Sequence, residues 1–337
     1  MPTTEWILEQ RGAKNSVDPY VPYFCLLEEE PSAQAYTAQA YTAQGYTARA
    51  TESPPLEQVL TIFLTNRECP YRCTMCDLWK NTTDETVPLG AIPAQIDFAL
   101  KRFGSADVVK LYNSGNFFDR QAIPREDWEP IARRVSGFRR VVVETHPRML
   151  KGVEEFAGMI APATLEVAMG LETVHPEVLP KLNKQMTLVD FQNAAERLVA
   201  AEIAVRAFIL LQPPWIDATS AREWAIKSIE FAFGVGVQCC SIVPTRDGNG
   251  AMEALESAGQ FHSPTLRSME TVLSDGLSGL NDGLPLERKR RVFMDTWDVE
   301  RFNTCVDCDG QRIRQIHAMN LHQIALAPIE CRKCQSR

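Results

Sequence analysis

Residues 65–80 read TNRECPYRCTMCDLWK and directly follow the apolar run VLTIFLT at 59–65. The run predicts a strand buried on both faces of a parallel sheet. Cys69, Cys73 and Cys76 then follow in the spacing C-x3-C-x2-C. Three thiolates can hold three irons of a cubane and leave the fourth iron without a protein ligand. The pattern predicts a [4Fe–4S] cluster with one open position, whereas a structural zinc ion takes four ligands and finds no fourth Cys or His nearby.

Short apolar runs alternate with amphipathic stretches between residues 59 and 245. This alternation predicts repeated right-handed βα units, whose loops at the carboxyl ends of the strands carry the chemistry. Six units are too few to close an eight-stranded barrel, so we expect an open, partial (β/α)6 barrel of the α/β class. Thr187 and Asp190 are placed to cap one of its helices. The expected strands are 59–65, 107–113, 141–144, 165–170, 203–211 and 237–243.

The sequence divides into three expected units. Residues 1–55 form an N-terminal extension that contains the repeat AYTAQAYTAQGYTARA at 35–50, which predicts a flexible insertion. Residues 56–250 form the partial barrel, and residues 251–337 form a C-terminal module.

Composition limits the class of protein. The net charge of −8 argues against a surface that binds nucleic acid or anionic membrane along its whole length. The N-terminus has no signal-peptide pattern and no stretch is apolar enough to span a membrane, so we expect a cytoplasmic protein without membrane contact. The ten cysteines then favour metal or cluster ligation over disulfides. The basic run 288–291 is expected to be either a solvated helix face or a phosphate-contacting patch.

C-x3-C-x2-C after the first strand of a six-unit partial barrel resembles the radical S-adenosylmethionine (SAM) superfamily. The resemblance implies that SAM binds the open iron through its amino and carboxylate groups. An electron from the cluster, supplied by a donor of the flavodoxin or ferredoxin type, would then cleave SAM to methionine and a 5′-deoxyadenosyl radical. The residue before the third cysteine is often aromatic in this family and is Met75 here.

Polar groups that follow the later strands are candidates to line the SAM or substrate pocket. The turn at 114–116 stands where the family commonly has a Gly-Gly-Glu motif that holds the methionine amino group. Taken singly, each carboxylate among these candidates is also compatible with a solvated loop. No catalytic residue is assigned. The candidates are Ser114, Gly115, Asn116, Glu144, Glu172 and Arg206.

The stretches YNSGNFFD…IP, GLET…NK…T…DF and FILLQPPW are similar to one branch, which includes the radical subunit that helps build archaeosine in transfer RNA and the Elongator catalytic subunit. The resemblance implies an oxidoreductase or lyase that modifies a tRNA nucleoside or a deazaguanine-type base, with tRNA or a tRNA-binding partner. Two alternatives stay open. One is a radical SAM enzyme that acts on a small metabolite or lipid precursor, and the other is a non-enzymatic iron–sulfur or zinc scaffold.

A second cysteine group stands near the C-terminal end. Cys305 and Cys308 form one C-x2-C pair, and Cys331 and Cys334 form another. Four thiolates complete a coordination shell, so this group predicts a structural zinc site or a second [4Fe–4S] cluster, with free thiols as the remaining alternative.

Overall fold

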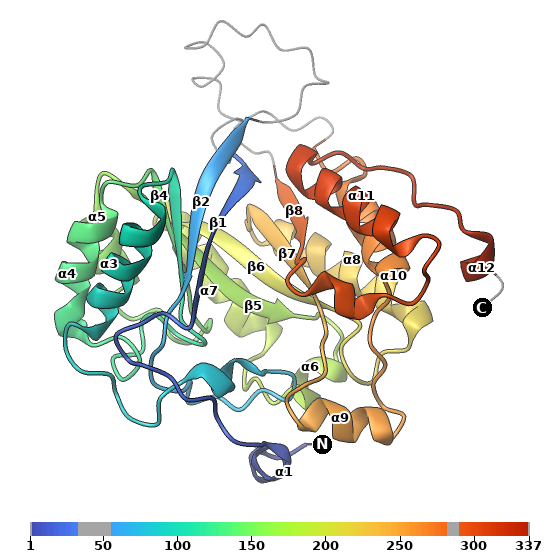
Figure 1. Ribbon diagram of the computed structural model, residues 1–337, viewed down its shortest axis with the longest axis horizontal. Helices are drawn as coiled ribbons and strands as arrows, with labels where there is room; N and C mark the ends of the chain where they lie inside the picture. Colours follow the sequence, from blue (N-terminus) through green and yellow to red (C-terminus); the bar gives the residue numbers. More distant parts are fainter. Residues whose placement is uncertain (1, 33–54, 282–289, 336–337) are drawn as a thin grey trace, which may run out of the picture.

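Eight strands form one curved sheet in the computed structural model, which describes residues 2–32, 55–281 and 290–335 (Figure 1). The repeat at 35–50 and residues 288 and 289 lie outside the described residues. The strands follow one another in chain order across the sheet, and neighbours are parallel except for the antiparallel first pair. They are β1 (Phe24–Pro31), β2 (Leu56–Phe63), β3 (Val108–Tyr112), β4 (Arg140–Glu144), β5 (Thr164–Glu172), β6 (Ala204–Leu211), β7 (Cys239–Pro244) and β8 (Arg291–Met294).

The six expected strands are confirmed as β2 to β7, and so is the open partial barrel. Alternating side chains point to opposite faces of each strand, so both faces need apolar residues when both are covered. Leu60 and Ile62 of β2 belong to the core between sheet and helices. Val59 of the same strand packs inside the barrel against Val108 and Val142.

Two strands were not predicted, and both carry charged residues. β1 adds an antiparallel edge from the N-terminal extension, and β8 adds a parallel edge from the C-terminal module. The expectation that the basic run 288–291 forms a solvated helix face or phosphate patch is wrong for Arg291. This residue begins β8 and is buried, with its guanidinium 3.5 Å from the Glu166 carboxylate. All three expected units therefore contribute to one sheet.

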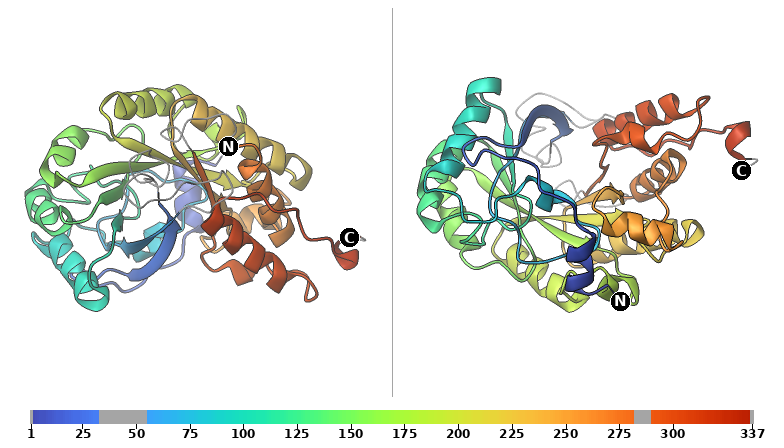
Figure 2. Two further views of the ribbon diagram at one scale, coloured as in Figure 1. Left: turned by 90° about the horizontal axis from the view of Figure 1, so that it is seen from above. Right: turned by 60° about the horizontal axis from the view of Figure 1, so that its bottom comes forward.

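Helices cover the convex face of the sheet, as Figure 2 shows. Thr187 caps α7 as expected, because its hydroxyl accepts from Asp190 N and the Asp190 carboxylate accepts in return. The helices are α1 (Thr4–Gln10), α3 (Ala91–Phe103), α4 (Trp128–Val135), α5 (Val153–Ile160), α6 (Val178–Lys181), α7 (Leu188–Ala200), α8 (Ala218–Gly234), α9 (Ala251–Ser257), α10 (Leu266–Leu277), α11 (Asp309–His322) and α12 (Arg332–Gln335), with short 3-10 helices η2 (Leu78–Asn81), η3 (Arg125–Asp127) and η5 (Val299–Phe302).

The open side of the half-barrel lies between β1 and β8. Helix α11 contacts both of these strands, and the rings of Phe24 and Trp297 meet edge-on with centroids 4.4 Å apart. Within the described ranges, no helix combines the length and apolar character that a bilayer crossing requires.

Candidate functional site

The three-cysteine loop leaves the carboxyl end of β2 and runs into η2. Two hydrogen bonds to distant residues fix its path: Thr74 N donates to Leu182 O (2.9 Å), and the side-chain amide Nδ2 of Asn249 donates to Cys76 O (3.1 Å). Cys69, Cys73 and Cys76 are partly exposed free thiols. The expected position of these cysteines, at the carboxyl edge of the barrel, is thus the position that the structure gives them.

The turn after β3 lies against the first cysteine. Asn116 Nδ2 donates to Cys69 Sγ (3.1 Å), and Asn116 Oδ1 accepts from His146 N (2.6 Å). A Cβ at Gly115 would lie 2.7 Å from Cys69 Cβ, so only glycine allows this close approach. Ser114 has a φ of +53°, a left-handed conformation that costs a non-glycine residue free energy and is frequent at functional sites. The structure therefore brings the predicted turn and the predicted cysteine loop together.

The Glu144 carboxylate accepts hydrogen bonds from the backbone of the same turn. The donors are the backbone N–H groups of Asn113 (2.6 Å) and Gly115 (3.3 Å). Burial raises the pKa of Glu144 to about 7, against the lowering effect of these backbone donors. The carboxylate that we expected in the SAM or substrate pocket thus orients the backbone beside Cys69.

Glu172, at the end of β5, forms a buried ion pair with Lys184 (Oε1 to Nζ, 2.6 Å). Lys184 was not predicted as a site residue, although the pair Asn183-Lys184 belongs to the GLET…NK…T…DF pattern that carries the resemblance. The backbone carbonyl of Lys184 is 2.9 Å from His146 Nε2, and the His146 ring stacks on Tyr71 of the cysteine loop at 3.9 Å. Burial and the Lys184 ammonium lower the pKa of His146 to about 4, so its imidazole is neutral at pH 7.

Arg206 is not part of this group, and the expectation that it lies near the carboxyl end of its strand is wrong. It is the third residue of β6, near the amino end, with 2% of its surface exposed. Its guanidinium contacts Glu166 Oε1 (2.6 Å) and Glu30 Oε2 (3.3 Å) inside the barrel. These belong to a buried network of four carboxylates and four cations: Glu28, Glu30, Glu57, Glu166, Lys110, Arg140, Arg206 and Arg291.

The environment of the three thiols fits a negatively charged cluster. Burial raises the pKa of Cys73 to about 12, and the Lys184 ammonium is the strongest opposing charge. Asn116 supplies an N–H donor to one sulfur, and hydrogen bonds and nearby cations are the groups that stabilise cluster-bound sulfur.

The four tail cysteines do converge. Their sulfur atoms all lie within 4.8 Å of one another, with 3.9 Å between Cys305 and Cys331 and 3.5 Å between Cys308 and Cys334. Arg312 Nε donates to Cys308 Sγ (3.4 Å), and its guanidinium also pairs with the buried Glu270 of α10. This group can bind a metal ion, and Arg312 links it to the rest of the fold.

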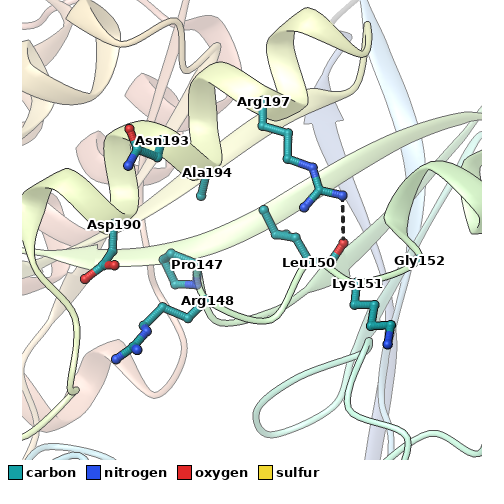
Figure 3. Close-up of a pocket in the computed structure, with 9 residues that line it drawn as sticks. All are labelled: Pro147, Arg148, Leu150, Lys151, Gly152, Asp190, Asn193, Ala194 and Arg197. Atoms are coloured by element: carbon teal, nitrogen blue, oxygen red, sulfur yellow. Dashed lines mark hydrogen bonds between the residues drawn. The ribbon is translucent and has the colours of Figure 1, made fainter.

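A groove of about 470 Å³ lies beside the β4–α5 loop (Figure 3). Arg148, Lys151 and Arg197 line it together with Asp190. Arg148 N donates to His146 Nδ1 (3.2 Å), so the groove borders the ring pair over the cysteine loop. Arg197 is already paired with Glu154, which leaves Arg148 and Lys151 as the basic groups best placed to meet an anion.

Comparison with known proteins agrees with this geometry. The family model of the Radical SAM superfamily matches residues 63–219. Archaeosine synthase subunit beta of Methanosarcina acetivorans is 26% identical over 232 residues, which cover 64% of this chain and 66% of that protein, just under two thirds of its length.

Two solved structures match at low sequence identity. Streptococcus suis SuiB bound to precursor peptide SuiA has a TM-score of 0.50 at 11% identity, over 70% of this chain and 48% of that chain. The archaeal Methanocaldococcus infernus Elp3 has a TM-score of 0.49 at 15% identity, over 68% of this chain and 58% of that chain.

The family match extends from the last residue of β2 to the first turn of α8 and includes the cysteine loop and the turn that approaches it. Members of this family are enzymes, and their domain implies a [4Fe–4S] cluster and SAM. Residues 63–219 thus match the Radical SAM superfamily model, and the chain is similar to archaeosine synthase subunit beta.

Proposed function

We propose that Cys69, Cys73 and Cys76 hold the [4Fe–4S] cluster and that SAM binds its open iron. The observation that carries this proposal is the hydrogen bond from Asn116 to Cys69 Sγ across a turn that only glycine allows. A cluster bound there would supply the electron for reductive cleavage of SAM to a 5′-deoxyadenosyl radical. Glu144 keeps the turn in place, and the stacked Tyr71 and His146 cover one side of the loop.

Alanine variants of the cluster cysteines test this assignment. Cys69→Ala, Cys73→Ala and Cys76→Ala should each lose about four irons and all formation of 5′-deoxyadenosine, because three thiolates leave no spare ligand. Cys240→Ala is the matched control, since this thiol is buried in the helix-facing core. Full activity of any one cluster variant after anaerobic reconstitution would show that the ligand set is wrong.

We further propose that the substrate is a nucleoside of tRNA or a deazaguanine-type base, and that the reaction is of the oxidoreductase or lyase class. The similarity to archaeosine synthase subunit beta supports this proposal, and the word subunit in that name suggests a protein partner. The reductant would be a one-electron donor of the flavodoxin or ferredoxin type. A small metabolite or lipid precursor is the second candidate substrate.

Salt dependence of tRNA binding tests the nucleic-acid substrate. Arg148 and Lys151 line the groove beside the β4–α5 loop, and each phosphate that the protein no longer neutralises should flatten the slope of log affinity against log salt by about 0.9. The double variant Arg148→Gln/Lys151→Gln should therefore bind bulk tRNA more weakly, as measured by filter binding from ~50 to 200 mM salt.

The control is Arg222→Gln/Lys227→Gln, which removes two basic residues from a groove along α8. It should leave the slope unchanged. If the wild-type chain binds no tRNA at low salt, either alone or with candidate partners, the nucleic-acid proposal fails and a small molecule becomes the leading substrate.

We propose zinc for the tail site. Zinc–sulfur bonds of about 2.3 Å in a tetrahedron place sulfur atoms ~3.8 Å apart, close to the 3.5 and 3.9 Å between the paired tail sulfurs. A cubane needs wider spacing because each thiolate binds a different iron. A variant lacking Cys69, Cys73 and Cys76 should retain about one zinc; about four irons with a visible chromophore would instead identify a second cluster.

A further inference from the structure

A bulge in β5 directs the Glu172 side chain back toward the barrel. The register with β6 shifts between Gly170 and Glu172, and Glu172 has a φ of +66°. Bulges of this kind redirect a side chain next to functional sites. A Cβ at Gly170 would collide with both Glu172 Oε1 and Lys184 Nζ. Three local features, a glycine, a bulge and a left-handed residue, thus make room for one ion pair.

The loop that carries Lys184 is attached to the cysteine loop. Thr74 lies between the second and third cysteines. Its hydroxyl Oγ1–H donates to Lys181 O (3.1 Å), and its backbone N–H donates to Leu182 O (2.9 Å). Asn183 Nδ2 donates to Arg72 O (2.7 Å). These bonds attach the segment that directly precedes Lys184 to the backbone of the cysteine loop.

The charge of Lys184 is buried and persistent. Burial alone would lower the pKa of Lys184, but the Glu172 carboxylate, followed by Cys73, raises it above its usual range. Lys184 is also the strongest cation acting on Cys69 and on Cys73. The pair is separate from the buried network around Glu166, which lies at the opposite end of the strands.

We propose that Lys184 and Glu172 form an electrostatic pair that sets the reduction potential of the cluster held by Cys69, Cys73 and Cys76. The inference rests on the proposed cluster ligands. Reduction adds one electron, taken from a low-potential one-electron donor, and increases the negative charge of the cluster. The Lys184 ammonium stabilises that added charge and raises the potential, whereas the Glu172 carboxylate limits the rise, because net charge near a cluster tunes its potential.

The two charges predict shifts of opposite sign. Lys184→Gln leaves an unpaired carboxylate and should lower the midpoint potential, and Glu172→Gln leaves an unpaired ammonium and should raise it. The double variant should lie between the two single variants, and Lys184→Arg should stay near wild type because it retains the charge. Arg222→Gln, which breaks an exposed pair with Asp275, should cause no shift.

The experiment is a redox titration with dithionite, followed by electron paramagnetic resonance of the anaerobically reconstituted full chain. Iron and sulfide content are measured first. If wild type forms no [4Fe–4S] cluster, the proposed ligands fail and this inference fails with them. If the cluster forms but both single variants shift in the same direction, or neither shifts, the electrostatic pair alone is refuted. If Lys184→Gln does not retain iron, the Glu172→Gln variant tests the proposal alone. A higher midpoint potential than wild type supports the electrostatic pair, and an unchanged or lower potential refutes it.

Discussion

Replacing Arg206 by methionine should destabilise the fold without affecting SAM binding. The change removes the guanidinium between Glu166 and Glu30, which lie 2.6 and 3.3 Å from it. Breaking a buried ion pair by removing one partner costs about 3–5 kcal/mol, because the remaining charge stays buried. Arg140 and Lys110 still contact the two carboxylates, so we expect the lower part of that range.

The expected change in melting temperature follows from chain length. At about 2.1 cal/mol/K of unfolding entropy per residue, the 337 residues give about 0.7 kcal/mol/K. A loss of 3–5 kcal/mol therefore lowers the melting temperature by roughly 4–7 °C. Arg222→Met, which breaks an exposed pair, should cost less than about 1 kcal/mol.

The assay combines thermal and urea denaturation with equilibrium dialysis of SAM. An Arg206→Met variant of wild-type stability that no longer binds SAM would refute this reasoning. It would also return Arg206 to the SAM pocket, where the sequence pattern places it.

Three further results are expected. Burial alone would raise the pKa of Glu166, but the charges of Arg206 and Arg140 outweigh burial and lower this pKa to about 2. The stabilisation from this carboxylate is therefore complete above about pH 4.5 and lost as the pH falls toward 2, and Glu166→Gln should flatten that part of a urea-stability profile. Gly115→Ala should reconstitute with less iron than Gly137→Ala, since a Cβ meets Cys69 at the first position and open space at the second; equal iron contents would contradict the close-approach argument. Cys308→Ser should release the tail metal and expose residues 323–335 to limited proteolysis while the barrel iron stays bound, because the metal supplies folding free energy to the tail; retained zinc and protection would contradict it.

The central strands could be predicted because parallel strands covered on both faces are continuously apolar. β1 and β8 could not, since their charged residues find partners far away in the sequence. Glu30 pairs with Lys110, 80 residues away, and with Arg206, 176 residues away. Taken alone, the three consecutive glutamates Glu28 to Glu30 indicate a solvated segment. They lie in a strand because the barrel interior supplies distant charged partners.

The site was predictable where local spacing carries the information. The cysteine spacing identified the loop, and the position of residues 114–116 after a strand identified the turn. What could not be predicted was how the polar groups are used: Glu144 binds backbone amides, and Asn116 binds a cysteine sulfur. The segment before Lys184 reaches the cysteine loop through a contact that spans 107 residues, between Thr74 and Lys181. The pattern GLET…NK…T…DF includes Lys184 but does not indicate this long-range contact.

The amide of Asn249, which holds Thr74 O and Cys76 O, has a consequence for biosynthesis. Asn249 lies 173 residues after Cys76, so the cysteine loop leaves the ribosome well before these two hydrogen bonds can form. At about 5–20 residues per second, that delay lasts roughly 9–35 s. During this interval the backbone carbonyls of Thr74 and Cys76 lack the Asn249 amide as a partner, so the path of the cysteine loop is completed only late in synthesis.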